Sequence, residues 1–269
     1  MNSASHEIRV VNAWCVFEHI SGRKVEALRG IDLHIPPGQL VCIVGRSGHG
    51  KSTLLRALGG LHPLTDGEIY VGDARVSGPS VQRGMVFQDD TVFPWMRVRA
   101  NVEFGLKAQR MPAADRRRIA SQWLERVDLI EFTDSWPREL SGGMRKRVAL
   151  ASVFASGSEI LLMDEPFGSL DYVTRLSLHQ LLLDLWRRTG RTILFVTHDV
   201  EEALILADRI LVMKDGIVVD DLIVQLQRPR NEDVRAHLRA VTLTKTILGH
   251  LGVGNFAAVN EERATPALD

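Results

Sequence analysis

The chain has 269 residues, 45% of them hydrophobic and 25% charged, which is the composition of an ordinary soluble globular protein with a sizeable core. Its 33 basic and 33 acidic residues cancel, so the net charge gives no reason to expect a nucleic acid or an anionic membrane surface as a partner. No apolar run approaches the roughly 20 residues of a membrane span, and no signal peptide is expected. Cys15 and Cys42 lie in apolar runs and are expected to be reduced core residues, so the sequence predicts a cytosolic protein.

The first part of the chain has short runs in which apolar and polar residues alternate, the pattern of half-buried strands. These runs cover residues 8–17, 25–28 and 31–35, and turn-forming residues stand at 21–24 and 36–38. The sequence therefore predicts a strand-rich N-terminal region.

The most informative stretch is Gly45–Thr53, which matches the pattern G-x-x-x-x-G-K-[ST] without exception. An apolar run at 39–44 precedes it and leucines with helical spacing follow it, so the loop joins a buried strand to a helix. Its glycines let successive backbone N–H groups form a concave nest that, with the helix N-terminus, favours phosphate oxygens. In such loops the lysine adds a charge for the β and γ phosphates and the following hydroxyl binds Mg²⁺. The candidate nucleotide-binding residues here are Gly45, Arg46, Ser47, Gly48, His49, Gly50, Lys51, Ser52 and Thr53.

The next stretch predicts a hairpin, a strand and helices. A turn at 65–67 precedes the hairpin around residues 72–73, and the apolar strand at 85–88 ends in the amide of Gln88. Residues 98–130 have helical spacing, interrupted at Pro112.

Two later stretches carry groups that interact with charge. The serine and two glycines at 141–143 open a helix, where the free N–H groups form either a second anion site or an ordinary N-cap followed by flexible glycines. An apolar strand at 160–163 ends in the paired carboxylates of Asp164 and Glu165. Burying both carboxylates costs free energy unless other groups at that place interact with their charge. Mg²⁺ and an attacking water would be such groups.

The rest of the chain continues the alternation of helices and strands. A leucine-rich helix ends near Gly190, and the apolar strand at 192–197 ends at His198. Open α/β sheets bind ligands at the carboxyl ends of their strands, so this histidine is a site candidate. A hairpin is expected at 210–219 and a helix at 233–251.

Three groups of residues have two interpretations each. Trp14, Phe17 and His19 offer flat rings for a base, although a core or edge-strand position explains such residues more simply. The apolar cluster at 93–96 is either core or a docking patch. The arginine run at 116–118 is most simply a solvated helix face.

The order of these motifs resembles the ATP-binding subunits of ABC transporters over roughly residues 8–220. In that family's vocabulary the chain has a P-loop at Gly45–Thr53, a Q-loop at Gln88, a signature at Leu140-Ser141-Gly142-Gly143, a Walker B strand ending at Asp164-Glu165, a D-loop at Ser169-Leu170-Asp171 and a switch His198. Residues 83–88, 93–95 and 165–171 are similar to the nitrate, sulfonate and taurine importers of the family.

The resemblance implies an α/β fold with a RecA-like P-loop NTPase core, an antiparallel β subdomain and an inserted α-helical subdomain. The ATP-binding domain would cover residues 8–225, with the helical subdomain at about 92–155 within it. Residues 226–269 would form a C-terminal helical extension whose end, at 260–269, is frayed.

The resemblance also implies roles in binding ATP and Mg²⁺. Lys51 and the P-loop amides would hold the β and γ phosphates. Ser52 and Gln88 would ligate Mg²⁺, and Asp164 would hold it through water.

The same resemblance implies roles in ATP hydrolysis. Glu165 would polarise the attacking water as general base, and His198 would contact the γ-phosphate and help to position that water. Phe17 is the best match to the aromatic residue that stacks on adenine. The implied catalytic set is Glu165, His198, Lys51 and Gln88.

The family's signature residues act in trans, which implies a head-to-tail dimer of two copies. Ser141, Gly142 and Gly143 of one copy would close on the ATP held by the other, with Asp171 at the seam. The chain would work at the cytoplasmic face of the cell membrane, with separate permease subunits near residues 93–95, and indirectly with a solute-binding protein. No nucleic-acid partner is expected.

Three residues depart from the family pattern. Met144 stands where glutamine is frequent, Ser152 where arginine is usual, and His49 where a small residue is commoner. We expect activity to survive these changes, with Ser152 affecting local stability and with His49 and Met144 near the same nucleotide in the closed dimer. An exporter or lipid-transport ATPase, and a soluble ABC ATPase without a permease, remain alternatives to an importer subunit.

Overall fold

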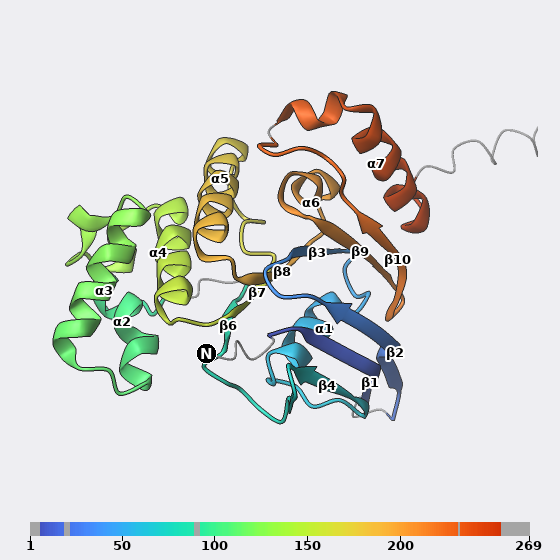
Figure 1. Cartoon of the computed structure of the whole chain (residues 1–269), viewed down its shortest axis with the longest axis horizontal. Coiled ribbons are helices and arrows are strands. Elements are labelled where there is room, and N and C mark those ends of the chain that lie inside the picture. The colour runs from blue at the N-terminus through green and yellow to red at the C-terminus, as the bar shows by residue number, and fades with distance from the viewer. Residues whose placement is uncertain (1–5, 19–21, 89–91, 231, 254–269) are drawn as a thin grey trace, which may run out of the picture.

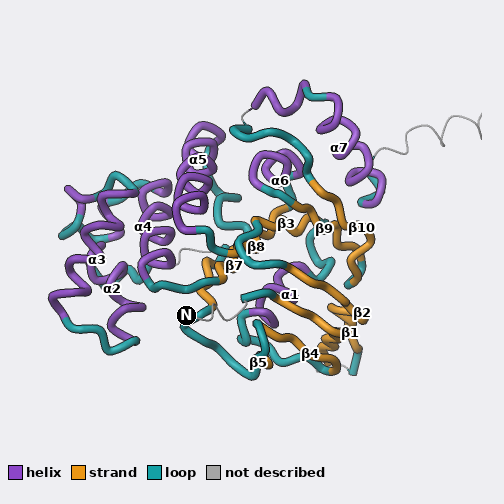
Figure 2. Tube along the Cα trace, viewed as in Figure 1, coloured by secondary structure: helices purple, strands orange, loops and turns teal. Residues whose placement is uncertain are grey.

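The computed structural model describes residues 6–18, 22–88, 92–230 and 232–253. Expectations for His19, for the start of the turn at 21–24 and for the chain end at 260–269 lie outside these residues. The described chain forms two sheets and a group of helices, with the strands gathered on one side of the molecule and helices α2, α3 and α4 on the other (Figure 2).

A six-stranded sheet forms the centre of the molecule, with the strand order β10-β9-β3-β8-β7-β6. Its strands are parallel except for β10, which pairs antiparallel with β9. Every residue of β3, β7 and β8 is buried, as expected for parallel strands covered on both faces. The pairing of Val44 with Thr197 and of Asp164 with Val196 makes these three strands end at the same edge. The bounds are β3 (Leu40–Val44), β6 (Arg83–Val86), β7 (Ile160–Asp164), β8 (Thr192–Thr197), β9 (Arg209–Lys214) and β10 (Ile217–Ile223).

A smaller antiparallel sheet has the order β2-β1-β4-β5 and packs with helix α1 against one face of the large sheet (Figure 1). Its strands and this helix are β1 (Ile8–Glu18), β2 (Lys24–Ile35), β4 (Asp66–Val71), β5 (Ala74–Arg75) and α1 (Lys51–Leu58). The expected separate strands at 25–28 and 31–35 are one strand, because Gly30 takes a φ of +67° and register shifts against β1 let the pairing continue. The expected turn at 65–67 is also partly strand, since β4 begins at Asp66.

Three helices, α2 (Val98–Ala108), α3 (Ala113–Arg126) and α4 (Gly142–Ala155), pack on one another beside the sheet (Figure 1). Pro112 separates the first two, as the sequence predicts, and short 3-10 turns lie at Ile130–Phe132 and Pro137–Glu139. In the arginine run of α3, Arg116 pairs with Glu103 on α2, whereas its two neighbours are exposed. Helix α4 also contacts β6, which joins the helical group to the large sheet.

The remaining helices cover the other end of the sheet. Helix α5 (Tyr172–Thr189) ends at Gly190 with a φ of +62°, which confirms the expected glycine C-cap. Helix α6 (Val200–Leu206) follows β8, and α7 (Leu238–His250) packs on α6, β9 and β10 after a 3-10 turn at Glu232–Ala236. No helix in the described part of the chain has the length and apolar character needed to cross a bilayer.

Arg230 fastens the C-terminal segment to the core. Its buried guanidinium donates to the main-chain carbonyls of Leu204, Ala207, Val224 and Leu226. Burial lowers the pKa of Arg230 to about 10, so the group still carries its charge at neutral pH. Carbonyl dipoles from the loop after β10 and from the end of α6 therefore point at one cation.

We expect Arg230→Leu to destabilise the protein, because the carbonyls that accept from Arg230 would be buried without donors. At about 1–3 kcal/mol for each unsatisfied group, less the desolvation regained, the net loss should be about 2–5 kcal/mol in urea unfolding. The exposed Arg239→Leu is the matched control and should unfold like the wild type. Equal unfolding midpoints for both variants would show that these hydrogen bonds do not hold the segment.

Candidate functional site

The glycine-rich loop lies between β3 and α1, and at Gly45 and Gly50 there is no room for a side chain. A Cβ atom on Gly50, whose φ is +93°, would lie 2.2 Å from the carbonyl oxygen of Ala27. A Cβ atom on Gly45 would lie 2.4 Å from the carbonyl oxygen of Met213. The loop is thus confined between the small sheet and β9, with α1 starting directly after it at Lys51.

A cavity of about 640 Å³ opens over this loop, a volume within the usual range for a small-molecule site. It brings together residues that the sequence analysis singled out from four separate stretches. Its lining residues are Ala27, Arg46, Ser47, Gly48, Gly50, Lys51, Ser52, Thr53, Gln88, Glu165 and His198.

Lys51 lies at the base of the cavity and is only 5% exposed. Its Nζ donates to the carbonyl oxygens of Gly45, at 2.9 Å, and Arg46, at 3.1 Å, and lies 4.0 Å from Glu165 Oε1. Burial lowers the pKa of Lys51, and the nearby carboxylates of Glu165 and Asp164 partly oppose this shift. An anion in the cavity would stabilise the charged amine better than the loop carbonyls do.

Ser52 and Asp164 meet next to this lysine. The Ser52 hydroxyl donates to Asp164 Oδ1 at 2.8 Å, and Asp164 is 3% exposed. Burial raises the pKa of Asp164 in spite of this hydrogen bond, so a cation would relieve its desolvation.

Oxygen donors of this kind suit Mg²⁺, which binds through one or two protein ligands and takes its other ligands from water and phosphate. Ser52, Asp164 and the amide of Gln88, which lines the same cavity, form such a donor set. Within the described ranges no three His, Cys, Asp or Glu side chains cluster to hold a metal by themselves. The residues present therefore fit an ion that arrives with a phosphate ligand.

Glu165 and His198 form a pair at the ends of β7 and β8. Glu165 has a φ of +43°, an uncommon value for a residue with a side chain, and its N–H donates to the Val196 carbonyl at 3.0 Å. Its Oε2 lies 2.9 Å from Nδ1 of the exposed His198 ring. The left-handed backbone thus turns the carboxylate from the end of a buried strand into the cavity.

Gln88 lies two residues beyond the end of β6, so the expected strand at 85–88 is too long at its carboxyl end. The buried Lys146 on α4 donates from Nζ to the carbonyl oxygen of Gln88 at 3.0 Å. Lys146 was not predicted from the sequence, although a lysine on the buried side of a helix could have indicated a functional contact. Ala27, which lines the cavity by chain topology alone and has no chemical signature, was not predicted either.

Ser141, Gly142 and Gly143 lie outside this cavity. The Ser141 hydroxyl accepts from the N–H of Met144 at 3.3 Å, so Ser141 is the N-cap of α4 within its own chain. A Cβ atom on Gly143 would lie 2.6 Å from Thr174 Cγ2, so the glycine lets α4 approach the start of α5. Asp171 caps α5 by accepting from the Thr174 N–H at 3.0 Å, and the hydrogen bonds from Thr174 lower the pKa of Asp171.

Three other predicted residues also do not line the cavity. Phe17 is 41% exposed and stacks on His62, with ring centroids 4.8 Å apart. His49 turns toward the β9–β10 turn, with Nδ1 3.3 Å from the Met213 carbonyl oxygen and Nε2 3.7 Å from Asp215 Oδ1. Met144 packs against the main core. The expectation that His49 of one copy and Met144 of the other lie near the same nucleotide concerns the dimer and stays a prediction.

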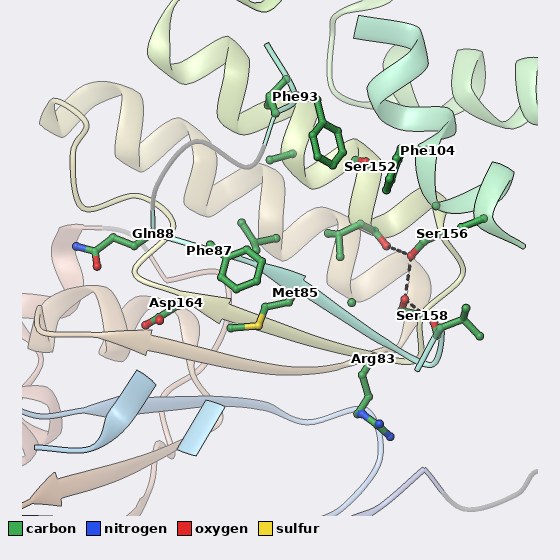
Figure 3. A pocket seen from close by; sticks show the side chains of 18 of the residues that line it. Arg83, Met85, Phe87, Gln88, Phe93, Phe104, Ser152, Ser156, Ser158 and Asp164 are labelled. Atoms are coloured by element: carbon green, nitrogen blue, oxygen red, sulfur yellow. Dashed lines mark hydrogen bonds between the residues drawn. The ribbon is translucent and has the colours of Figure 1, made fainter. Parts of the chain in front are cut away.

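A larger groove of about 820 Å³ lies between β6 and helices α2 and α4 (Figure 3). The rings of Phe93 and Phe104 stand together at one side, with centroids 4.6 Å apart, and Gln88 and Asp164 lie at the other end of the view. Trp95, also a lining residue, is 69% exposed. The cluster at 93–96 is therefore not simply core. Its two rings line a groove that extends to Gln88 and Asp164.

A polar network joins the segment at 93–96 to α2 and α4 beside the groove. Asn101 donates from Nδ2 to the carbonyl oxygens of Phe93 and Met96 and accepts from the Phe93 N–H at 2.7 Å. Ser152 lines the groove and donates to the Asn101 carbonyl at 2.8 Å. The small hydroxyl at 152 thus leaves space in the groove and still satisfies a main-chain acceptor.

Comparisons with known proteins bear on this arrangement. The family described as "ABC transporter" matches residues 28–168. The nitrate import ATP-binding protein NrtD of Synechocystis sp. is 49% identical over 213 residues, covering 77% of this chain and 80% of that protein. The aliphatic sulfonates import ATP-binding protein SsuB of Rhodopseudomonas palustris is 50% identical over 203 residues, covering 76% and 71%. A dimeric post-hydrolysis structure of the ATP-binding cassette MJ0796 with ADP and Pi has a TM-score of 0.73 and 31% identity, covering 82% of this chain and 100% of that one.

Asp164→Asn should make the ligand-free protein at least as stable as the wild type at pH 7. Because the pKa of Asp164 is raised in the folded protein, the protonated carboxyl group stabilises the fold. This contribution is complete below the unperturbed pKa of 3.8 and is lost as the pH rises through the folded pKa. Asparagine can keep the Ser52 hydrogen bond without the charge, so its advantage in Tm should shrink as the pH falls toward 4.

The same variant should gain less Tm than the wild type when Mg²⁺ and ATP are added, since a cation ligand is lost. Ser158→Ala, a change at another buried polar side chain, is the control for the ligand effect. A variant that is less stable than the wild type at pH 7 and equally stabilised by Mg²⁺ and ATP would contradict this view of Asp164.

Proposed function

The chain belongs to the ABC transporter family as an ATP-binding subunit that hydrolyses ATP, and we propose that it powers the import of a small anion through a separate membrane permease. The observation that carries the proposal is the single cavity in which the P-loop, Gln88, Glu165 and His198 meet. The relatives are named as ATP-binding proteins of nitrate import and of aliphatic sulfonates import, which supports an anion of the nitrate, sulfonate or taurine class.

ATP would bind with its phosphates over the P-loop. Lys51 would exchange the loop carbonyls for β- and γ-phosphate oxygens, joined by N–H groups of the residues at 45–53. Ser52 and Gln88 would ligate Mg²⁺ and Asp164 would hold it through water. The ion, when bound, supplies charge neutralisation on the phosphates. Phe17, exposed at the end of β1, is the proposed platform for adenine.

Hydrolysis would proceed by attack of water on the γ-phosphorus. Glu165 would accept the water proton as the new P–O bond forms and the bond to the ADP oxygen breaks. His198, 2.9 Å from Glu165, would contact the γ-phosphate and orient the water between them. The left-handed backbone at Glu165 supports this role, because strained residues persist where the surrounding structure holds them for function.

A head-to-tail dimer would complete two such sites. Ser141, Gly142 and Gly143 lie outside the cavity of their own chain, which supports their closing on the ATP of a second copy. Asp171 would then lie at the seam between the copies. The similar MJ0796 structure is a dimer. ATP would favour the closed dimer because it contacts both copies there and only one copy in the open form.

We also propose the domain division expected from the resemblance. Helices α2, α3 and α4 fall within the proposed helical subdomain at about 92–155, inside an ATP-binding domain at 8–225. Residues 226–269 would be the C-terminal extension, to which α7 belongs.

Glu165→Gln should bind ATP and lower its turnover by about 10²–10⁴-fold, because the amide cannot accept the proton. With ATP and Mg²⁺ the stalled protein should elute as a dimer in size-exclusion chromatography. The exposed Glu125→Gln is the control and should turn over ATP like the wild type. A Glu165→Gln protein that stays monomeric and hydrolyses ATP at the normal rate would sink the proposal.

The groove between β6, α2 and α4 is the proposed site for a cytoplasmic segment of the permease. It presents the exposed rings of Trp95 and Phe104 beside the half-buried Phe93. Gln88 and Asp164, two of the proposed Mg²⁺-binding residues, also line it. A bound permease segment would therefore contact the element that carries a Mg²⁺ ligand. With its permease bound there, the chain would work at the cytoplasmic face of the membrane, and a solute-binding protein would act indirectly through the permease.

Trp95→Ala should reduce recovery of permease subunits from membranes by about 10-fold, as expected for an exposed aromatic at an interface, and leave the ATPase rate of the isolated chain within about twofold. Phe132→Ala, at another exposed ring outside the groove, is the control. Cells with Trp95→Ala should also lose uptake of nitrate or alkanesulfonates. Recovery of no integral membrane protein with the wild type, or a defect in export alone, would contradict the importer proposal.

A further inference from the structure

Helices α5 and α6 both start next to residues of the proposed ATP site. Helix α5 begins after Asp171, and α6 begins after His198 and its own N-cap, Asp199. The side chains that join the two helices therefore lie close in sequence to both proposed functional positions.

Two polar contacts, one helical turn apart on α5, join it to the start of α6. Arg175 Nη1 lies 3.2 Å from Asp199 Oδ2, and His179 Nε2 lies 2.7 Å from Glu202 Oε1. Asp199 also accepts from the N–H groups of the first turn of α6, so the Arg175 contact holds the cap itself. The remaining acidic residue of this turn, Glu201, pairs with Arg235 from the C-terminal segment.

The His179–Glu202 contact is almost fully buried, with 3% and 7% of the two side chains exposed. Removing one partner would leave the other polar group buried without its contact, so the pair fixes the spacing of the helices. The His179 ring also packs on Phe167, at a centroid distance of 5.7 Å. Phe167 follows Glu165 by two residues and packs in turn on Phe195 of β8, the strand that ends at His198.

Among the described residues, two buried nitrogen atoms of the α5–α6 seam, Arg175 Nε and His179 Nδ1, have no hydrogen-bond partner. Both side chains line a cavity of about 20 Å³ between α5 and α6. A space of this size holds one water molecule. Such a water would accept from the Arg175 Nε–H and donate to His179 Nδ1, which leaves the Nε2–H of the ring to donate to Glu202.

We propose that Arg175 and His179, bridged by one buried water, are positioning residues that fix the start of α6 and thereby hold His198 beside Glu165. The inference rests on the proposed role of His198 in ATP hydrolysis. His179 does not touch the cavity over the P-loop, so its effect on the reaction passes through Glu202 and the backbone of α6. A misplaced His198 would alter the reacting geometry more than ATP binding, which Lys51 and the loop provide.

The first test separates positioning from plain stability by steady-state ATPase kinetics at 25 °C. His179→Leu should lower kcat by about 10-fold, the usual effect of removing a supporting contact, and leave KM for ATP within about twofold. His179→Gln, whose amide can still donate to Glu202, should restore kcat to within about threefold of the wild type. Leu183→Ala, at a buried position of the same helix outside the seam, should lower Tm and keep the wild-type kcat.

The second test places the effect on His198 and uses the double variant His179→Leu/His198→Ala. If the seam acts through His198, the double variant should be no slower than His198→Ala alone. If the kcat losses of the two single variants multiply in the double variant, or if His179→Leu has a normal kcat, the positioning role is wrong. A normal kcat in His198→Ala would instead overturn the proposed function on which it rests, so the two failures are distinguishable.

Discussion

Lys51 and Asp164 are buried side by side at the carboxyl edge of the large sheet, and burial acts on them in opposite directions. It lowers the pKa of the lysine and raises that of the carboxyl group, so each charge is disfavoured there without a ligand. A phosphate chain with its Mg²⁺ offers an anion to the first and a cation to the second. The parallel strands that end together, the loop confined by Ala27 and Met213, and the turned backbone of Glu165 all serve to hold these charges at one edge.

Much of this arrangement could be predicted from the sequence because it depends on local chemistry. The apolar run before Gly45 and the leucines after Lys51 fix a strand, a loop and a helix, and the alternation of strands and helices brings later strand ends to the same edge. The fold differs from the sequence-based expectation where strand pairing outweighs the local preference of a residue for turns. Gly30 is a turn residue by type, yet β1 pairs on both sides of it, so one long strand replaces two.

The parts of the site that could not be predicted depend on contacts between distant segments. Ala27 contributes only a backbone and a methyl group, and Lys146 reaches the Gln88 carbonyl from a helix far along the chain. His49 belongs to the P-loop by sequence, but its ring turns toward the β9–β10 turn because Met213 and Asp215 offer acceptors there. Pattern identifies which residues share a loop, whereas the direction of each side chain depends on neighbours that only the fold supplies.

In the proposed dimer each ATP site uses the P-loop of one chain and Ser141 of another. Mixing two inactive variants, Lys51→Ala and Ser141→Arg, and measuring ATPase activity under conditions in which dimers form tests this shared site. Half of the dimers should then contain one complete site, so the mixture should recover about a quarter of the wild-type rate although neither variant hydrolyses ATP alone. A mixture no more active than its separate components, with heterodimers shown to be present, would contradict a site shared between two chains.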